Sequence, residues 1–266
     1  MLAAWCRRQK LGAWSPSTIA GAVADLREPE PPDRPCWGYE VTATDVMWRE
    51  DGTGFRQRGR KQELLVVQDE HARLKLNWKL ATGPAAAKDV CSYLEAAFCQ
   101  YGPPLVLKHD GAGIFKEDTV AKLLARYGVV ELTAPPGWPG YNGKQERSMR
   151  DIKSYERALR RHGVKGTLQG RIALAMQDLN EDRPRPVLGG RTAKEAYRQD
   201  RAMFPDRSAF CREVISEART LGRNAASRSE RAQARRRAVE VVLLRHGLLQ
   251  ISGDVSLDFT SDEWTQ

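Results

Sequence analysis

Apolar residues change their spacing several times along the chain, and each spacing predicts a different kind of element. Branched and aromatic residues are typical of strands, and they are concentrated in two early segments. Three consecutive strands are expected, over residues 37–47, 62–68 and 72–80, the last with Leu76 and Trp78 on one face. The first third of the chain therefore predicts β-structure.

Between the first two of these strands, residues 49–61 read REDGTGFRQRGRK and have no apolar period, which predicts a polar loop or hairpin excursion. Further on, helical spacing predicts helices over 85–101 and near 117–127. Short apolar runs at 105–107 and 129–132 predict two more strands. The resulting order, βββαβαβα, describes an α/β protein with a mixed five-stranded sheet flanked by helices, which is the topology of the ribonuclease H-like fold.

The two ends of the chain depart from this α/β pattern. Residues 1–34 are expected to form a helical remnant similar to the last helix of a helix-turn-helix, followed by a Pro-rich linker. The α/β core is expected over 35–200. Residues 201–266 predict an amphipathic helix, a basic helix that ends near Gly247 and a small terminal hairpin.

Net charge changes the picture because it is unevenly distributed. The chain carries +9, and residues 183–246 contain 16 Lys or Arg against 7 Asp or Glu, so this segment holds the whole imbalance. Such a segment indicates a polyanionic partner, although a solvated helical surface has the same composition. The sequence shows no apolar run of membrane-spanning length, no secretory signal and no CxxC pair, so a cytoplasmic protein with reduced thiols is expected.

Two carboxylates stand at element boundaries, where metal-assisted phosphoryl transfer needs them. Asp110 ends the strand LVLK and precedes the flexible GAG, while Glu146 follows the Pro-rich loop 135–145 and is expected in the first turn of a helix, whose N-terminus favours an ionised carboxylate. Two divalent cations can activate the attacking oxygen and stabilise the leaving oxygen of a phosphodiester. Mg²⁺ needs only a few such carboxylates.

At these positions the sequence resembles the DDE integrase and transposase core, a family that includes retroviral integrases and bacterial insertion-sequence transposases. The stretch LKHDGAGIF at 107–115 is similar to the family's strand-end Asp motif, with Gly111 where Asn is usual. PPGWPGYNGKQERSMRDIKS at 135–154 is similar to its loop, Asn-Gly and catalytic Glu, and 35 residues separate the two acids, as in the D-35-E pattern. LNEDRPRPVLGGRTAKEAY at 179–197 is similar to the segment that closes the core.

The resemblance implies a third carboxylate in the first strand, usually within W-x-x-D-x-T. Two residues of CWGYEVTATDVMW compete for that role. Asp45 has the usual residue type, and Glu40 fits the frame set by Trp37 and Thr42. Because an odd number of residues separates them, their side chains face opposite sides of a regular strand. Asp45 is favoured, because the aspartate side chain is shorter than that of glutamate. The expected catalytic and metal-binding residues are therefore Asp45, Asp110 and Glu146.

The helix that carries Glu146 is also expected to contact DNA. Basic residues recur along it, and the loop before it is expected to place an aromatic ring near unpaired bases. The expected DNA-binding residues are Tyr141, Asn142, Lys144, Arg147, Arg150 and Lys153. Of the remaining candidates, Asp69 is expected to be structural and His109 to be packed or hydrogen-bonded.

The combined pattern predicts a transposase or integrase. It would use two Mg²⁺ or Mn²⁺ ions to cleave element ends and to transfer them to target DNA during transposition, with double-stranded DNA as its partner. The resemblance further implies a homo-oligomer. Two alternatives stay open: a catalytically inactive DNA-binding remnant, suggested by Gly111 and the ambiguous first acid, and a ribonuclease H-type nuclease.

Overall fold

The computed structural model describes residues 38–57, 59–111, 113–134 and 139–252. Residues 39–251 form one compact unit. The helical remnant and linker expected at 1–34 lie outside the described residues. Within the described part, no helix is both long enough and apolar enough to cross a membrane.

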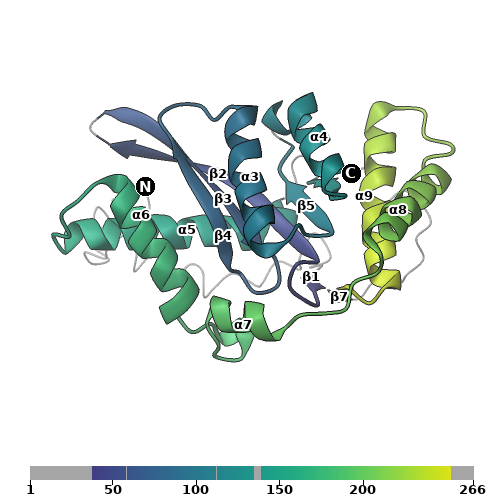
Figure 1. Ribbon diagram of the computed structural model, residues 1–266. Helices are drawn as coiled ribbons and strands as arrows, with labels where there is room; N and C mark the ends of the chain where they lie inside the picture. Colours follow the sequence, from purple (N-terminus) through teal and green to yellow (C-terminus); the bar gives the residue numbers. More distant parts are fainter. Residues whose placement is uncertain (1–37, 58, 112, 135–138, 253–266) are drawn as a thin grey trace, which may run out of the picture. The chain divides into compact units, whose positions relative to one another are not determined.

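A five-stranded sheet forms the centre of the unit (Figure 1). In chain order its strands are β2 (Met47–Gln57), β3 (Arg60–Asp69), β4 (Lys75–Ala81), β5 (Val106–His109) and β6 (Val130–Thr133). Their order across the sheet is β4-β3-β2-β5-β6. The first three strands are antiparallel and β5 and β6 run parallel to β2, which confirms the predicted mixed sheet.

The start of the sheet differs from the expectation. The strand predicted over 37–47 is divided into β1 (Gly38–Val41) and β2, because Asp45 has a φ of 63°, which no extended strand accommodates. The polar segment expected as a loop or hairpin excursion does form a hairpin, but as regular strands that make up most of β2 and the beginning of β3. The segment lacks an apolar period because β2 buries charged residues. One of them, Arg49, forms an ion pair with Glu70, in which Nη2 of Arg49 lies 3.0 Å from Oε1 of Glu70.

Strand β4 also breaks the expected alternation. The register against β3 shifts between Val67 and Gln68, which is a β-bulge. Leu76 consequently packs in the cluster on one face of the sheet, whereas Trp78 packs against the cluster on the other face.

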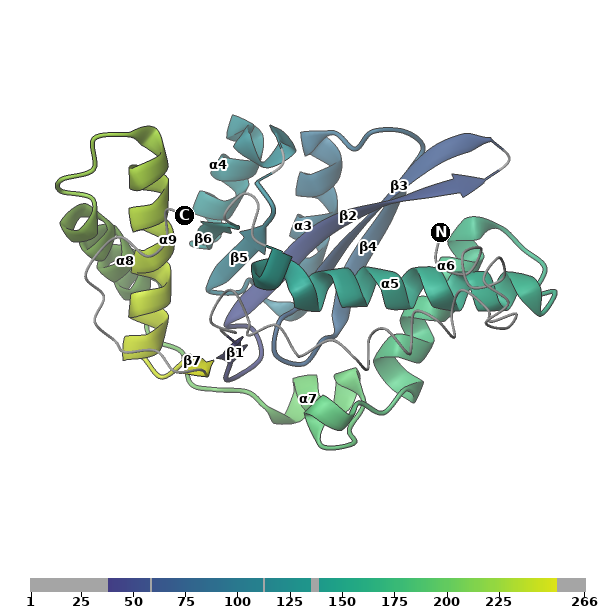
Figure 2. The same ribbon diagram turned by 180° about the vertical axis from the view of Figure 1, so that it is seen from behind.

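Helices cover both faces of the sheet (Figures 1 and 2). On one face α3 (Ala87–Tyr101) and α4 (Asp118–Arg126) enclose an apolar cluster with the strands. On the other face α5 (Pro139–Arg161) and α6 (Leu168–Gln177) pack over β2 and β3. The short helical turns are η1 (Gly113–Lys116), the π-helical η2 (Asp178–Asp182) and η3 (Pro186–Leu188).

The chain after residue 200 packs onto the same unit. Helix α7 (Ala193–Gln199) is followed by α8 (Arg207–Leu221) and α9 (Arg228–Arg245), and the last two share an apolar cluster with Met47, Val106 and Leu132 of the sheet. Strand β7 (Leu249–Ser252) pairs with β1 in a separate two-stranded sheet. The expected terminal hairpin thus contributes one strand to a pairing with β1, and residues 253–266 lie outside the described residues.

Candidate active site

Asp110 lies exposed directly after β5, where the chain leaves the sheet. The next residue, Gly111, has a φ of 79°, a left-handed conformation that lets the chain turn away at once. The turn therefore presents the Asp110 carboxylate at the carboxyl-terminal edge of the parallel strands. This is the edge at which open α/β sheets bind ligands.

His109 holds this turn from inside the protein. It is buried, it stacks on Phe115 with ring centroids 4.2 Å apart, and its Nδ1 accepts the Gly111 N–H at 3.0 Å. The other ring nitrogen, Nε2, lies 2.9 Å from Glu131 Oε1 and therefore carries the proton that it donates. This hydrogen bond lowers the pKa of Glu131. The prediction that His109 is a packed, hydrogen-bonded residue is confirmed.

Gly111 also fits its neighbour. A Cβ at this position would lie 2.7 Å from Thr133 Cγ2 of β6, closer than real Cβ atoms approach another atom. The family's usual Asn tolerates a left-handed φ, but its Cβ would meet the same methyl group. Glycine at 111 and threonine at 133 are thus sterically matched, so the departure from the family pattern does not loosen the turn.

The acidic residue level with Asp110 on the neighbouring strand is Asp51. The parallel register pairs Met47 with Val106, Trp48 with Leu107 and Arg49 with Lys108. Continuing it by two residues on each strand places Asp51 beside Asp110. Residues level with each other on adjacent strands have side chains on the same face of the sheet, so both carboxylates belong to one edge and one face.

Helix α5 covers that face. Asp51 is paired across the antiparallel ladder with Val66, and Val66 packs in the cluster that contains Met149 and Ile152 of α5. The Asp51 side chain is partly exposed, and its Oδ1 accepts the Gly52 N–H at 2.8 Å. Asp51 thus lies on the α5 side of the sheet and has access to solvent.

Glu50 lies behind this edge, on the opposite face, where it is buried beside Tyr93 of α3. Burial raises the pKa of Glu50 well above its ordinary value, and the negative charges of Asp51 and Asp110 raise it further. Because both aspartates act on the same group, both lie near it. Burial and these two neighbouring charges therefore favour the protonated, uncharged form of Glu50.

Neither expected candidate for the first carboxylate lies near Asp110. Asp45 precedes β2, and its carbonyl accepts the Leu105 N–H at the opposite end of β5, roughly 17 Å away along the strand at about 3.3 Å per residue. Its Oδ1 accepts hydrogen bonds from Tyr197 at 2.5 Å and from Trp48 Nε1 at 3.1 Å. Burial raises the pKa of Asp45, although these two donors oppose the rise. The side chain therefore stabilises a turn.

Glu40 lies in β1, outside the five-stranded sheet, and its exposed carboxylate is 3.7 Å from Arg73. Asp69 has the structural role expected for it. It is fully buried, its two oxygens accept the N–H groups of Asp45 and Ala72, and burial raises its pKa to about 7.

Glu146 lies in α5, whose described backbone begins at Pro139, five residues earlier than the expected start near Lys144. Proline is well tolerated in the first turn of a helix, where its missing N–H is not required. Glu146 is consequently in the third turn, beyond the reach of the helix N-terminus that was expected to favour its charge. The structure describes the helical backbone of residues 139–146 but not their side chains, and residues 135–138 lie outside it.

The basic residues expected to bind DNA follow α5. Arg147 and Arg150 are exposed, and the Lys153 ammonium lies 5.9 Å from the ring centroid of Phe55 in β2. Ser148, on the buried side, donates to Gln68 at 2.6 Å and fixes the helix to the sheet. The side chains of Tyr141, Asn142 and Lys144 are outside the described set.

The sequence did carry a signal for Asp51. Trp48, Asp51 and Thr53 fit W-x-x-D-x-T, eleven residues after the frame that begins at Trp37. The indole of Trp48 is fully buried and packs on Phe98 with ring centroids 5.7 Å apart. Local pattern does not indicate a strand here, because the segment is polar, contains glycines and has no apolar period.

The donors at this edge suit a hard divalent cation. Mg²⁺ prefers oxygen ligands and takes only one or two carboxylates together with water, and Asp51 and Asp110 supply two. Among the side chains that the structure describes, no three acidic, His or Cys residues gather around one point. Helix α5, whose backbone includes Glu146, lies over the same face of the sheet.

Comparisons with known proteins agree with this architecture, although no protein-family model matches the sequence. The Gag-Pro-Pol polyprotein of mouse mammary tumor virus (strain BR6) is 26% identical over 157 residues, which are 56% of this chain and 9% of the polyprotein. The chain thus spans less than a tenth of that relative.

Among solved structures, the HTLV-2 integrase catalytic core domain in complex with magnesium has a TM-score of 0.52 and 17% identity, covering 60% of this chain and 99% of that domain. A chain of the simian T-cell lymphotropic virus intasome in complex with PP2A regulatory subunit B56 gamma has a TM-score of 0.56 and 15% identity, covering 63% of this chain and 59% of that chain. The chain therefore has the ribonuclease H-like fold of retroviral integrase catalytic cores, as its sequence motifs predict.

Proposed function

We propose that this protein is a DDE-type polynucleotidyl transferase that cleaves DNA strands and joins them to target DNA. In this proposal Asp51, Asp110 and Glu146 form the catalytic and metal-binding set, and Asp51 replaces Asp45. The observation that supports it is the parallel register of β2 and β5, which pairs Arg49 with Lys108 and, continued by two residues, brings Asp51 level with Asp110.

Two Mg²⁺ or Mn²⁺ ions bound there would supply activation of the attacking oxygen and stabilisation of the leaving one. The magnesium present in the HTLV-2 core domain supports a divalent metal. The protein's own contribution is positioning. His109 and Gly111 fix the turn that carries Asp110, and Ser148 fixes α5 on the sheet.

Double-stranded DNA, as element ends and target, is the proposed substrate. Arg147 and Arg150 project from the helix that carries Glu146, so phosphates held by them would lie beside the carboxylates. The dimeric and trimeric crystal forms of the HTLV-2 domain support a homo-oligomer, and transposition is the biological process that we infer.

The alternative of an inactive remnant is suggested by Gly111 and by the ambiguity of the first acid between Asp45 and Glu40. Both reasons are weakened, because Gly111 is matched to Thr133 and Asp51 stands level with Asp110.

The test is a strand-transfer assay with labelled DNA ends and Mg²⁺ or Mn²⁺. We expect Asp51→Asn, Asp110→Asn and Glu146→Gln each to reduce product by at least roughly a hundredfold, because each removes a metal ligand. An exposed acid outside the five-stranded sheet serves as the charge-matched control, Glu40→Gln, and should retain activity.

Each other outcome is informative. Cleavage of one strand of a hybrid duplex without joining would identify a ribonuclease H-type nuclease. No metal-dependent product of any kind from the unmodified protein would refute the enzyme and favour the inactive remnant. Loss of product in Asp45→Asn but not in Asp51→Asn, with both variants folded, would restore the original assignment.

A further inference from the structure

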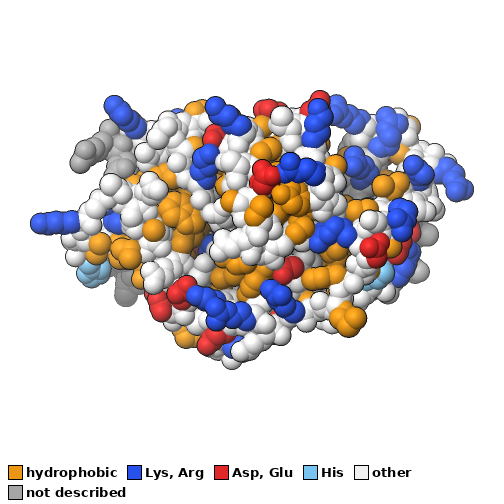
Figure 3. Space-filling model, viewed as in Figure 1, with side chains coloured by type: hydrophobic (Ala, Val, Ile, Leu, Met, Phe, Trp, Pro, Cys, Tyr) orange, Lys and Arg blue, Asp and Glu red, His pale blue; other side chains and the backbone are white. Residues whose placement is uncertain are grey.

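The C-terminal helical pair α8–α9 carries most of the chain's excess positive charge. Between Arg207 and His246 there are ten arginines and four glutamates, a net +6 of the total +9. Figure 3 shows Lys and Arg side chains gathered over these two helices. A surface of this kind is the electrostatic footprint of a polyanion site, but its arrangement must distinguish such a site from a solvated helix.

Three of the arginines form a stripe along α9. Arg228, Arg231 and Arg235 follow one another at i, i+3 and i+7, which places them on one side of the helix over about 10 Å at 1.5 Å per residue. All three are exposed. We call these three residues the α9 stripe.

The α9 stripe lowers the stability of its own helix. Arg228 and Arg231 lie in the first turn, where the helix dipole repels cations, and neighbouring arginines at i, i+3 and i, i+4 repel each other. No acid stands three or four residues from any of the three. Glu230, the acid of that turn, accepts the N–H groups of Ala226 and Ser227 in the helix cap. A bound anion would relieve both kinds of repulsion.

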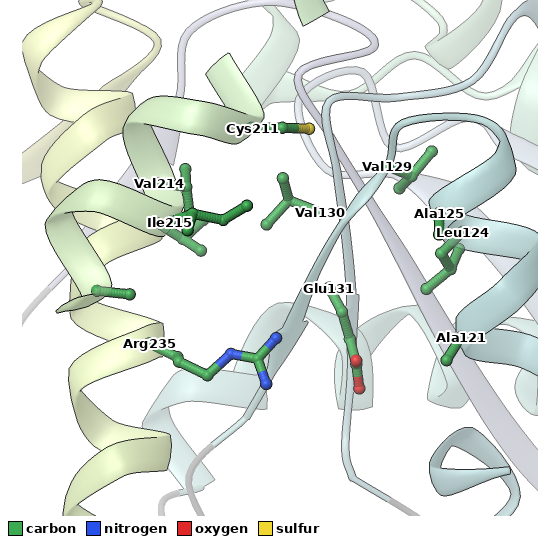
Figure 4. Close-up of a pocket in the computed structure, with 12 residues that line it drawn as sticks. Ala121, Leu124, Ala125, Val129, Val130, Glu131, Cys211, Val214, Ile215 and Arg235 are labelled. Atoms are coloured by element: carbon green, nitrogen blue, oxygen red, sulfur yellow. The ribbon is translucent and has the colours of Figure 1, made fainter. Parts of the chain in front are cut away.

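The stripe ends beside the catalytic edge. Arg235 reaches from α9 toward Glu131 of β6 across a groove of about 330 Å³ (Figure 4), and its charge contributes to lowering the pKa of Glu131, after the hydrogen bond from His109. His109 in turn accepts the N–H of Gly111, the residue after Asp110. Two hydrogen bonds thus link Glu131, on which the charge of Arg235 acts, to the turn that carries the proposed catalytic aspartate.

We propose that the α9 stripe is a second DNA-binding surface, which holds the phosphate backbone of duplex DNA that extends from the catalytic edge across β6. Guanidinium groups suit this role because they bind phosphate oxygens through two parallel N–H bonds. The contacts are to phosphates, so they position DNA without selecting its sequence. The inference rests on the proposed function only for the choice of DNA as the polyanion.

The test measures binding rather than catalysis. Arg228→Gln with Arg235→Gln removes two charges and leaves Arg231, whose Nη1 donates to the Ala225 carbonyl, in place. The matched control removes two exposed cations on α3 and α7, Lys88→Gln with Arg198→Gln. Fluorescence anisotropy of a labelled duplex across a salt series gives both affinity and the slope of log K against log salt.

For the α9 double variant we expect roughly tenfold weaker binding at low salt and a slope smaller by about 1.8, since each lost phosphate contact contributes about 0.9. Its thermal midpoint should not fall, because like-charge repulsion is removed, so loss of folding cannot explain the result. An affinity and slope equal to those of the control would overturn the proposal. Equal weakening for the duplex and for heparin at matched salt would also count against it, because it would identify a general anion surface.

Failure here and failure of the proposed function are separable. Asp110→Asn should bind the duplex with the unmodified slope while making no strand-transfer product. An unmodified protein that binds through α9 but shows no metal-dependent chemistry would leave the α9 stripe standing and refute the enzyme.

Discussion

The contact between Gly111 and Thr133 gives a quantitative test of how the Asp110 turn is built. Gly111→Ala places a Cβ on a residue with a φ of 79° and 2.7 Å from Thr133 Cγ2. The left-handed backbone costs about 1–2 kcal/mol for a non-glycine residue, and overpacking costs about 1–3 kcal/mol. Because a β-branched threonine is stiff at χ1, the methyl group does not move away freely. We expect a total loss of roughly 3 kcal/mol in the free energy of unfolding.

A double-mutant cycle separates the two contributions. Thr133→Ser removes only the methyl group, at about 0.8 kcal/mol or less because the site is partly exposed. In the Thr133→Ser variant, Gly111→Ala should lose only the free energy that the left-handed backbone costs. Urea unfolding of the four proteins should therefore give a coupling energy of about 1–3 kcal/mol. Strand transfer should recover in parallel, since the turn positions Asp110. Gly113→Ala, with nothing within 4 Å of its added Cβ, is the near-neutral control. Additivity within about 0.5 kcal/mol would show that steric matching is absent.

Three further changes test the supports of the site. His109→Ala should lower the strand-transfer rate about tenfold, whereas His109→Asn, which keeps an acceptor near the Gly111 N–H, should retain more of it; equal losses would contradict the positioning role. Burial lowers the pKa of Lys75 to about 7. Between that pH and about 10.4 the unfolded chain binds the extra proton, so stability should rise with pH by up to roughly 1.4 kcal/mol per unit, and Lys75→Met should remove this slope in urea titrations. Glu156 and Arg171 tie α5 to α6 through a largely buried 2.8 Å pair, so Glu156→Ala should cost roughly 3 kcal/mol, and replacing both residues by methionine should cost less.

How far the sequence predicted the fold depends on which forces act on each segment. The helices α3 and α4 and the strands β5 and β6 follow the expected ranges closely, because their apolar spacing reflects burial on one face. Strand β2 does not, since it buries Arg49 and Glu50, whose charges are accommodated by tertiary partners that no local period records. The bulge in β4 likewise arises from its pairing with β3.

The parts of the candidate site that belong to short sequence motifs were predictable from the sequence. Asp110 occupies the strand end that its motif indicates, and Glu146 lies in the helix expected for it, though that helix starts earlier. Asp45 does not lie with them. The alternation of side chains along a strand separates Asp45 from Glu40, but it does not show that the backbone turns at Asp45, where φ is 63°. The position of the α9 stripe beside β6 was also beyond local pattern, because it depends on how α8 and α9 pack on the sheet.

Strand β2 therefore explains both why Asp45 does not lie beside Asp110 and how the candidate site is built. The start of β2 is buried on both faces of the sheet. Helix α3 covers one face, and helices α5, α8 and α9 cover the other. About seven residues later the strand reaches the surface, where Thr53 is partly exposed and Gly54 is exposed. Asp51 lies between the buried and the exposed parts of the strand. A hydrophobic run would suit only the buried part. Charged residues with tertiary partners, such as Arg49 with Glu70, allow the buried part of β2 to continue directly into Asp51, which reaches solvent.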